Sequence, residues 1–209
     1  MGIPVLCLGE SGSGKTYSIK NFKPDEVGIF SVRKGTLPFK EGKNFKVAKN
    51  ADYQTIYKVL QNPTLKAYVI DDSQFLMVNE FFRKANEAGY QKYTSIGKNF
   101  SDLFEYIAYK VPEDVIVYFL HHTQVGQDGK LKAKTVGQML DNYLTLEGCC
   151  DVVLLAQTDG ANHYFITQTD GSNTAKSPEG MFDAQIPNDL ALVDKTIREY
   201  YGMVGKEKK

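Results

Sequence analysis

The chain has 209 residues, 42% of them hydrophobic, which is enough for one domain with a single buried core. Its 25 basic and 25 acidic side chains cancel, which excludes the strong positive field that would draw the whole protein to nucleic acid or to an anionic membrane. Three cysteines without a disulfide framework, and no apolar run near the roughly 20 residues of a membrane span, lead us to expect a cytoplasmic protein with no membrane partner.

Strands and helices are expected to alternate along most of the chain. Apolar residues at helical spacing predict helices around Ile56, Val78 and Phe104. Crossover connections of this kind place parallel strands in one sheet. The strands are predicted from short apolar runs, rich in β-branched residues, at 4–8, 27–32, 67–70, 115–120 and 152–156.

The last quarter of the chain has a different pattern. Turn dipeptides on both sides of 163–167 predict antiparallel strands, and Asn188 is expected to cap a last helix that runs through Tyr200. No composition break divides the chain, so we predict a single domain over 1–204 and a frayed basic tail over 205–209. The expected fold class is α/β, with a mostly parallel central sheet and a C-terminal antiparallel hairpin.

A phosphate-binding loop is predicted directly after the first strand. The segment fits the pattern Gly-x-x-x-x-Gly-Lys-[Ser/Thr] and precedes a stretch compatible with a helix. Its glycines let backbone N–H groups face phosphate oxygens, while the following helix presents its positive end. Lys15 is expected to hold the β- and γ-phosphates of a nucleotide, and Thr16 to bind Mg²⁺. The expected nucleotide-binding residues are Gly9, Glu10, Ser11, Gly12, Ser13, Gly14, Lys15 and Thr16.

Two adjacent aspartates follow the third predicted strand. A phosphate loop needs a second carboxylate for its metal, placed at the end of a neighbouring strand. Asp71 comes first after the apolar run and is the candidate for Mg²⁺. Two interpretations of Asp72 stay open: it activates the attacking water, or it only caps the helix that begins near Ser73.

Polar residues also follow the fourth predicted strand, in the sequence His121-His122-Thr123-Gln124. Ligands of open α/β sheets bind at the carboxyl ends of the strands, so we expect a γ-phosphate sensor here, with His122 and Gln124 as candidates. The alternative is a histidine that simply closes the strand in solvent. Zinc is disfavoured, because adjacent residues of a strand point to opposite faces of the sheet.

Together these motifs resemble the RecA-type branch of P-loop ATPases, and more narrowly the small phage-encoded nucleotide-binding and single-strand annealing proteins that look like a RecA core without flanking domains. The resemblance covers nearly the whole chain and includes the segment 173–178. It implies a three-layer P-loop NTPase fold, with ATP and Mg²⁺ as ligands and ATP hydrolysis as the activity. It also implies single-stranded DNA binding or annealing in recombination or replication, a ring or filament of identical subunits, and phage recombination or single-strand-binding proteins as partners.

The loop after the fourth predicted strand is the candidate for DNA contact. By resemblance this loop approaches DNA, and it carries three lysines at alternate positions, Lys130, Lys132 and Lys134. On an extended segment this spacing places the ammonium groups on one side, which suits a phosphate backbone. A solvated hairpin around Asp128 and Gly129 is the other interpretation.

Two further catalytic groups follow from the resemblance. RecA-type enzymes usually carry a glutamate near the end of the second strand, whereas this chain has Arg33 in that region, so hydrolysis is expected to depend on Asp72 or to be slow. Charge on the transferred phosphoryl group needs a cation beyond Lys15. Lys176 resembles the lysines that RecA-type filaments supply across the subunit interface, and Arg33 is the second candidate. The alternative for Lys176 is an ordinary surface lysine.

The leading hypothesis is an ATP-binding and ATP-hydrolysing RecA-like protein that acts on single-stranded DNA. A nucleotide-gated interaction module with little turnover is the alternative without catalysis, and the missing glutamate favours it. A P-loop kinase is the other enzymatic alternative. It needs an arginine-rich lid over the phosphates, and this chain has only three arginines.

Overall fold

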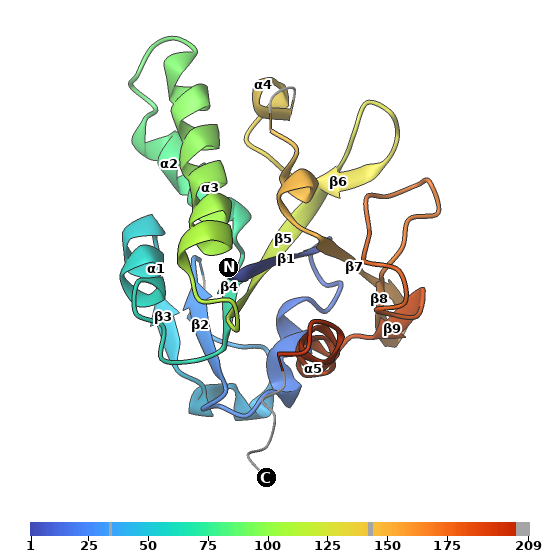
Figure 1. Ribbon diagram of the computed structural model, residues 1–209. Helices are drawn as coiled ribbons and strands as arrows, with labels where there is room; N and C mark the ends of the chain where they lie inside the picture. The colour runs from blue at the N-terminus through green and yellow to red at the C-terminus, as the bar shows by residue number, and fades with distance from the viewer. Residues whose placement is uncertain (34, 142–143, 204–209) are drawn as a thin grey trace.

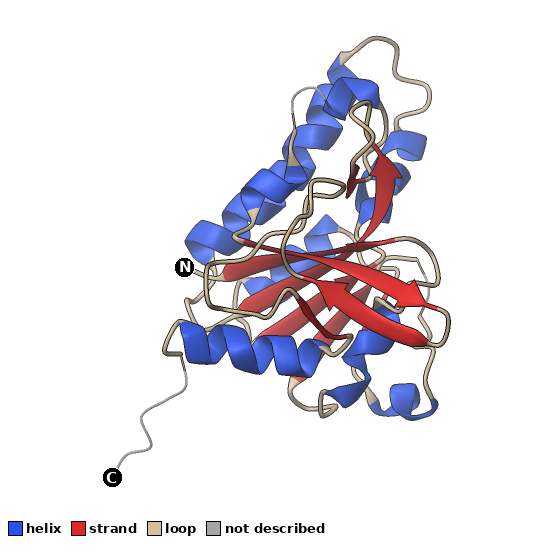
Figure 2. Ribbon diagram, turned by 90° about the vertical axis from the view of Figure 1, so that its right-hand side faces the viewer, coloured by secondary structure: helices blue, strands red, loops and turns tan. Residues whose placement is uncertain are grey.

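The computed structural model describes residues 1–33, 35–141 and 144–203, so the tail expected at 205–209 lies outside the described residues. The chain folds around a central sheet with helices on both of its faces (Figure 1). Figure 2 shows the long helix on one side of the sheet and the last helix on the other. The predicted α/β class is confirmed.

The described residues form a sheet of nine strands that is mostly parallel. The parallel part consists, in spatial order, of β3 (Val47–Lys49), β2 (Val27–Ser31), β4 (Ala67–Asp71), β5 (Ile116–Val125), β1 (Ile3–Gly9) and β7 (Val152–Asp159). The antiparallel strands are β8 (Asn162–Ile166) and β9 (Gln185–Pro187), which continue the sheet beyond β7, and β6 (Leu131–Ala133), which pairs with the end of β5. The predicted C-terminal antiparallel hairpin is therefore confirmed.

Helices cover both faces of the sheet. One face packs against α1 (Tyr53–Leu60), α2 (Gln74–Arg83) and α3 (Gln91–Lys110), and the other packs against the 3₁₀ helix η1 (Thr16–Asn21) and α5 (Leu190–Tyr200). The short elements η2 (Lys40–Asn44), α4 (Gln138–Asp141) and η3 (Leu146–Cys149) lie in connections. None of the described helices has the length and apolar character needed to cross a membrane.

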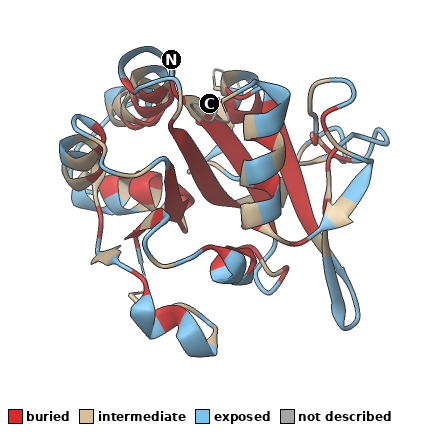
Figure 3. Cartoon of the chain, turned by 60° about the horizontal axis from the view of Figure 1, so that its bottom comes forward, coloured by how far each residue is buried: buried red, intermediate tan, exposed pale blue. Residues whose placement is uncertain are grey.

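Both faces of the sheet are buried because residues of one strand alternate between two apolar clusters. In β5, Val117 and Phe119 pack in the cluster beneath α3, whereas Tyr118 belongs to the cluster beneath α5. Phe119 stacks on Phe104 of α3 with ring centroids 4.1 Å apart. Figure 3 shows the result, with buried strands between helices whose outer sides are exposed. Continuous apolar runs are what such strands require.

A short helix follows the predicted phosphate-binding loop. It is a 3₁₀ helix of six residues. Ser18 donates its hydroxyl to the carbonyl of Lys15, a local bond that competes with helical bonding, and Pro24 prevents continuation of the helix. The loop after β1 is therefore followed by a short 3₁₀ helix and not by a long α-helix.

The N-cap of α5 is Asp189 and not the predicted Asn188. The carboxylate of Asp189 accepts the N–H groups of Ala191 and Leu192, which would otherwise lack partners at the start of the helix. The side chain of Asn188 instead donates to the carbonyl of Gly14 in the phosphate-binding loop. Asp189 thus caps the helix, while the preceding residue, Asn188, contacts the candidate site.

Candidate functional site

Three parallel strands bring several of the predicted site residues to one edge of the sheet. β5 lies between β1 and β4, and Gly9 pairs in register with His122. The carboxyl ends of these strands therefore place the loop after β1, the two aspartates after β4 and His122 together. They line a cavity of about 410 Å³, to which His163 of β8 also contributes.

The predicted phosphate loop, residues 9–16 and called the phosphate loop below, contains two glycines whose backbone conformation would be strained in a residue with a side chain. Gly12 has φ +85° and Gly14 has φ +92°, values in the left-handed region that glycine adopts without cost. The Nζ of Lys15 folds back over the loop and donates to the carbonyls of Gly9 and Glu10, both at 2.8 Å. The ammonium group is thus held inside the loop, where phosphate oxygens can replace these carbonyls as acceptors.

Lys15 and Asp71 are two buried charged groups at the mouth of the loop, 7% and 5% exposed. Burial lowers the pKa of Lys15 to about 8, although the carboxylates of Asp72 and Asp71 act in the opposite direction. Burial raises the pKa of Asp71 to about 6, although the hydrogen bond from Thr16 acts in the opposite direction. That bond joins Thr16 Oγ1 to Asp71 Oδ1 at 2.8 Å. The charged form of each group is therefore disfavoured by burial, and a bound ligand of opposite charge would stabilise it.

Asp72 lies beside Asp71 in a strained backbone conformation. Its φ is +59°, which is uncommon outside glycine and is tolerated by aspartate. Its Oδ1 lies 3.3 Å from Nε2 of His122, and both residues line the cavity. Ser73 occupies the N-cap position of α2. Strained residues of this kind cluster at functional sites, so the placement favours a role at the cavity over a helix cap for Asp72.

His121 points away from the cavity and links two segments inside the protein. Its Nε2 lies 2.7 Å from the carbonyl oxygen of Lys134, which can only accept, so this nitrogen carries the proton. Its Nδ1 lies 2.9 Å from the hydroxyl of Ser73 and accepts from it. Burial lowers the pKa of His121 to about 4, so the ring is neutral at pH 7. His121 thus connects the segment after Asp72 to the strand pair β5–β6.

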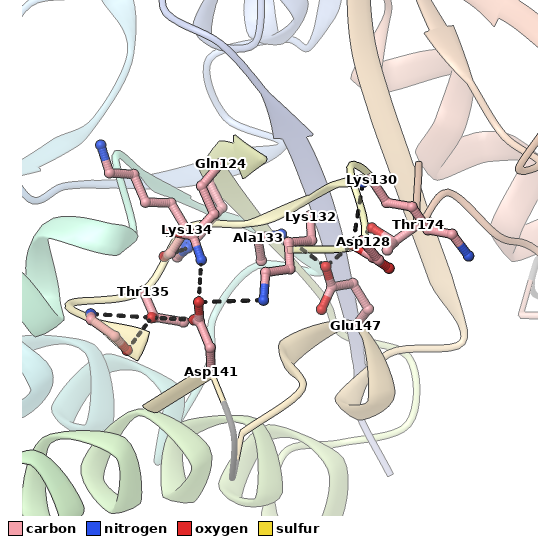
Figure 4. A network of polar contacts seen from close by, with 12 residues as sticks. Gln124, Asp128, Lys130, Lys132, Ala133, Lys134, Thr135, Asp141, Glu147 and Thr174 are labelled. Carbon is pink, nitrogen blue, oxygen red and sulfur yellow. Dashed lines mark hydrogen bonds and ion pairs between the residues drawn. The ribbon is translucent and has the colours of Figure 1, made fainter. Parts of the chain in front are cut away.

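Gln124 is not among the described residues that line the cavity. Its Nε2 donates to Oδ2 of Asp141 at 2.7 Å, and Nζ of Lys132 lies 3.3 Å from the same oxygen. Thr135 donates its hydroxyl to the other carboxylate oxygen of Asp141 (Figure 4). Of the two predicted phosphate sensors, His122 therefore lies at the aspartates and Gln124 belongs to the base of the lysine hairpin, residues 125–134.

The three lysines of the lysine hairpin do not share one side. Figure 4 shows the ammonium groups of Lys130 and Lys134 pointing away from each other, while Lys132 points toward Asp141. The extended strand β6 ends at Ala133, so the alternation expected of a strand does not include all three residues. Lys130 and Lys134 are exposed to solvent. The expected one-sided arrangement is therefore reduced to two separated, exposed cations.

Neither candidate for the second cation is among the described residues that line the cavity. The guanidinium of Arg33 lies 4.5 Å from the ring centre of Phe75, and that ring packs edge-on against His122. Lys176 is exposed and its backbone pairs with Val153, near the start of β7. Val153 is in register with Leu6, in the middle of β1, and not with Gly9, where the loop begins. Within one chain, Arg33 is the candidate that is linked to His122, through Phe75.

Two residues that the sequence did not indicate contact the phosphate loop. Nδ1 of His163 lies 3.2 Å from the carbonyl oxygen of Ser13, and Nδ2 of Asn188 donates to the carbonyl oxygen of Gly14 at 2.9 Å. These pairs are separated by 150 and 174 positions along the chain. No periodicity or motif connects such distant residues. The pairing of β8 with β7 brings His163 to the loop, and Asn188 follows β9, which pairs with β8.

No model of a known protein family matches the chain, and no curated protein sequence matches it. Within residues 1–33, 35–141 and 144–203, no group of three or more His, Cys, Asp or Glu side chains could hold a metal ion. Thr16 and Asp71 are two oxygen-bearing side chains at the cavity that could hold a metal ion together with an anionic ligand.

His121→Gln should reduce the pH dependence of the free energy of unfolding between pH 7 and pH 4. The native ring has a pKa of about 4, whereas an unfolded histidine titrates near 6.5, so the unfolded state binds more protons between these values. Acidification to pH 4 should therefore destabilise the wild type by roughly 3 kcal/mol through this group, with the full stability retained above about pH 6.5.

Urea unfolding of both proteins at several pH values measures this effect. The difference in unfolding free energy between wild type and variant reports on His121 alone, because Asp71 is present in both proteins. The raised pKa of Asp71 changes stability in the opposite direction. A difference that stays constant from pH 7 to pH 4 would show that His121 is not held neutral.

Proposed function

We propose that the chain binds ATP at the phosphate loop and hydrolyses it to ADP and phosphate, as a RecA-type P-loop ATPase. The observation that carries the proposal is the hydrogen bond between Thr16 and Asp71, 2.8 Å long, beside the buried ammonium group of Lys15. A glycine-rich turn without function would not need a buried lysine and a buried carboxylate at its mouth, because burial of each charge costs free energy.

The residues at the cavity fit a bound Mg²⁺. This ion prefers oxygen ligands and is commonly held by one or two carboxylates together with phosphate oxygens. Thr16 and Asp71 would hold it here. Burial raises the pKa of Asp71 to about 6, and a nearby cation would favour the ionised carboxylate. When bound, the ion would neutralise negative charge on the β- and γ-phosphates.

Asp72 and His122 are the groups for the attacking water. The water oxygen bonds to the γ-phosphorus while the bond to the β–γ bridging oxygen breaks, and ADP leaves with that electron pair. Asp72 accepts the proton of the water, and His122, 3.3 Å away, holds the carboxylate in place. Lys15 stabilises charge on the phosphate oxygens. Arg33, or Lys176 of a neighbouring copy, would supply the second cation.

A nucleotide-gated interaction module with little turnover is the second candidate. It is favoured by the end of β2, where Arg33 follows the strand that pairs with β4 and a RecA-type enzyme would carry a glutamate. The role of general base then falls on Asp72, and an ordinary carboxylate is a weak base for water. In this case nucleotide binding itself would change assembly or partner binding.

Single-stranded DNA is the proposed partner, in binding or annealing during recombination or replication. The lysine hairpin exposes Lys130 and Lys134, and the carbonyl of Lys134 is bonded through His121 to Ser73, next to Asp72. A DNA phosphate at Lys134 would thus act on a segment joined to the nucleotide site. A ring or filament of identical chains, contacts with recombination or single-strand-binding proteins, and a cytoplasmic location belong to the same proposal.

Phosphate release from ATP is the direct test of the proposed activity. We expect slow release that single-stranded DNA increases, and that Lys15→Ala abolishes together with ATP binding, because the ammonium group contacts phosphate. Lys20→Ala, at an exposed lysine of η1, is the matched control and should leave release unchanged.

ATP binding without release supports the interaction module, and phosphate transfer to a small acceptor indicates a kinase. Unchanged binding by Lys15→Ala would contradict the phosphate-loop assignment.

Asp71→Asn should act through the metal. The substitution removes a negative charge that Mg²⁺ needs, but it leaves the N–H groups of the loop intact. We expect a loss of at least about tenfold in Mg²⁺-dependent turnover, and a much smaller loss in ATP binding measured with a chelator present. Equal losses with and without Mg²⁺ would show that Asp71 serves the fold or the nucleotide directly.

Replacing Lys130 and Lys134 together by alanine should reduce the salt dependence of DNA binding. Each neutralised phosphate of a single strand contributes about 0.7 to the slope of log affinity against log salt, so the double variant should lose up to about 1.4. All sequences should be affected equally, because phosphate contacts carry no sequence information. The control is the same change at Lys46 and Lys58, two exposed lysines outside the hairpin. Equal slopes for wild type and double variant would exclude the lysine hairpin as the DNA contact.

A further inference from the structure

We propose that His163 and Asn188 are positioning residues, which direct two backbone N–H groups of the phosphate loop toward the phosphates. Each side chain binds a carbonyl oxygen of the loop, and the N–H group of the same peptide plane then points the opposite way. The inference rests on the proposed nucleotide-binding function and deepens it. It assigns a role in phosphate binding to two residues that lie outside the loop motif and more than 140 positions away from it.

Both contacts have a fixed direction. A carbonyl oxygen can only accept, so Nδ1 of His163 must carry the hydrogen that reaches Ser13 at 3.2 Å. The side-chain amide of Asn188 donates to Gly14 at 2.9 Å, and the same oxygen also accepts the N–H of Ser18 at 3.0 Å. The carbonyls of Ser13 and Gly14 are therefore both occupied by donors from outside the loop or from η1.

The geometry of the peptide bond turns these two contacts into constraints on N–H groups. A trans peptide is planar, and its C=O and the N–H of the next residue point in opposite directions. Holding the carbonyl of Ser13 therefore fixes the N–H of Gly14, and holding the carbonyl of Gly14 fixes the N–H of Lys15. These N–H groups therefore point away from His163 and Asn188. In our proposal, they belong to a nest of N–H groups that binds the phosphates.

The loop needs such constraints because its glycines allow other conformations. Gly14 has φ +92°, and a glycine can exchange positive and negative φ values at little cost. A free loop would pay for this freedom when it binds an anion, whereas a loop held in its bound form would not. The two side chains also leave no room at Gly14: an added Cβ would lie 2.6 Å from Nδ2 of Asn188 and 2.9 Å from Nδ1 of His163.

The two side chains come from elements that are themselves fixed. His163 lies in β8, which pairs with β7, and Asn188 immediately precedes Asp189, the N-cap of α5. Asp189 accepts a hydrogen bond from Asn21 at the end of η1, so α5 and the segment after the loop are joined a second time. Figure 1 shows this arrangement, with the blue segment after β1 next to the red α5. The donors are thus placed by the sheet and by α5, and not by the loop.

Binding of ATP and of inorganic tripolyphosphate to the full-length chain, followed by calorimetry, tests the proposal. His163→Ala and Asn188→Ala should each weaken both ligands about tenfold, because one charge-assisted hydrogen bond is no longer oriented. His163→Asn should restore most of the affinity, since an asparagine amide places a donor close to the position of Nδ1. Asn162→Ala, an exposed neighbour of His163 on β8, should leave the affinity unchanged.

The outcomes separate this inference from the proposed function. A wild type that binds neither ATP nor tripolyphosphate removes the proposed function and the positioning role with it. A wild type that binds both, with His163→Ala and Asn188→Ala binding equally well, overturns the positioning role alone. A His163→Asn variant as weak as His163→Ala would also overturn it, because the ring and not the donor would then be required. Thermal melting of each variant identifies any loss that comes from unfolding.

Discussion

The burial of Lys15 and Asp71 together at one edge of the sheet is the constraint on which the candidate site depends. Two charged groups that are 7% and 5% exposed cannot be left without polar partners, so Lys15 turns to the loop carbonyls and Asp71 accepts from Thr16. Burial pushes the two pKa values toward neutrality, to about 8 and about 6. A polyphosphate with its cation would supply the missing charges of both signs, which is why this edge suits a nucleotide.

The order of the strands determines which groups meet at that edge. β5 lies between β1 and β4, and so His122 stands beside Gly9, the first residue of the loop, and reaches Asp72. The preceding residue, His121, points to the other face and bonds Ser73 and the carbonyl of Lys134. One strand end thus contacts the candidate nucleotide site with one side chain and the lysine hairpin with the adjacent one, a consequence of the alternation of side chains along a strand.

The C-terminal part of the chain completes the loop from outside. β8 and the start of α5 bring His163 and Asn188 to the carbonyls of the loop, although neither residue belongs to a recognisable motif. A hydrogen bond between Asn21 and Asp189 joins η1 and α5 on the same side. The first and last parts of the chain therefore meet around the loop.

The sequence by itself determined the features that depend on neighbours along the chain. Apolar runs predicted the buried strands, the spacing of glycines predicted the loop, and a carboxylate after an apolar run predicted the position of Asp71, because these signals need only a few adjacent residues. The tertiary structure alone decided that Asp189 and not Asn188 caps α5, that Gln124 and Lys132 turn to Asp141, and that His163 reaches Ser13. Each of these outcomes is a choice between partners far apart in sequence, and hydrogen-bond donors and acceptors find such partners only after the strands have been placed next to one another.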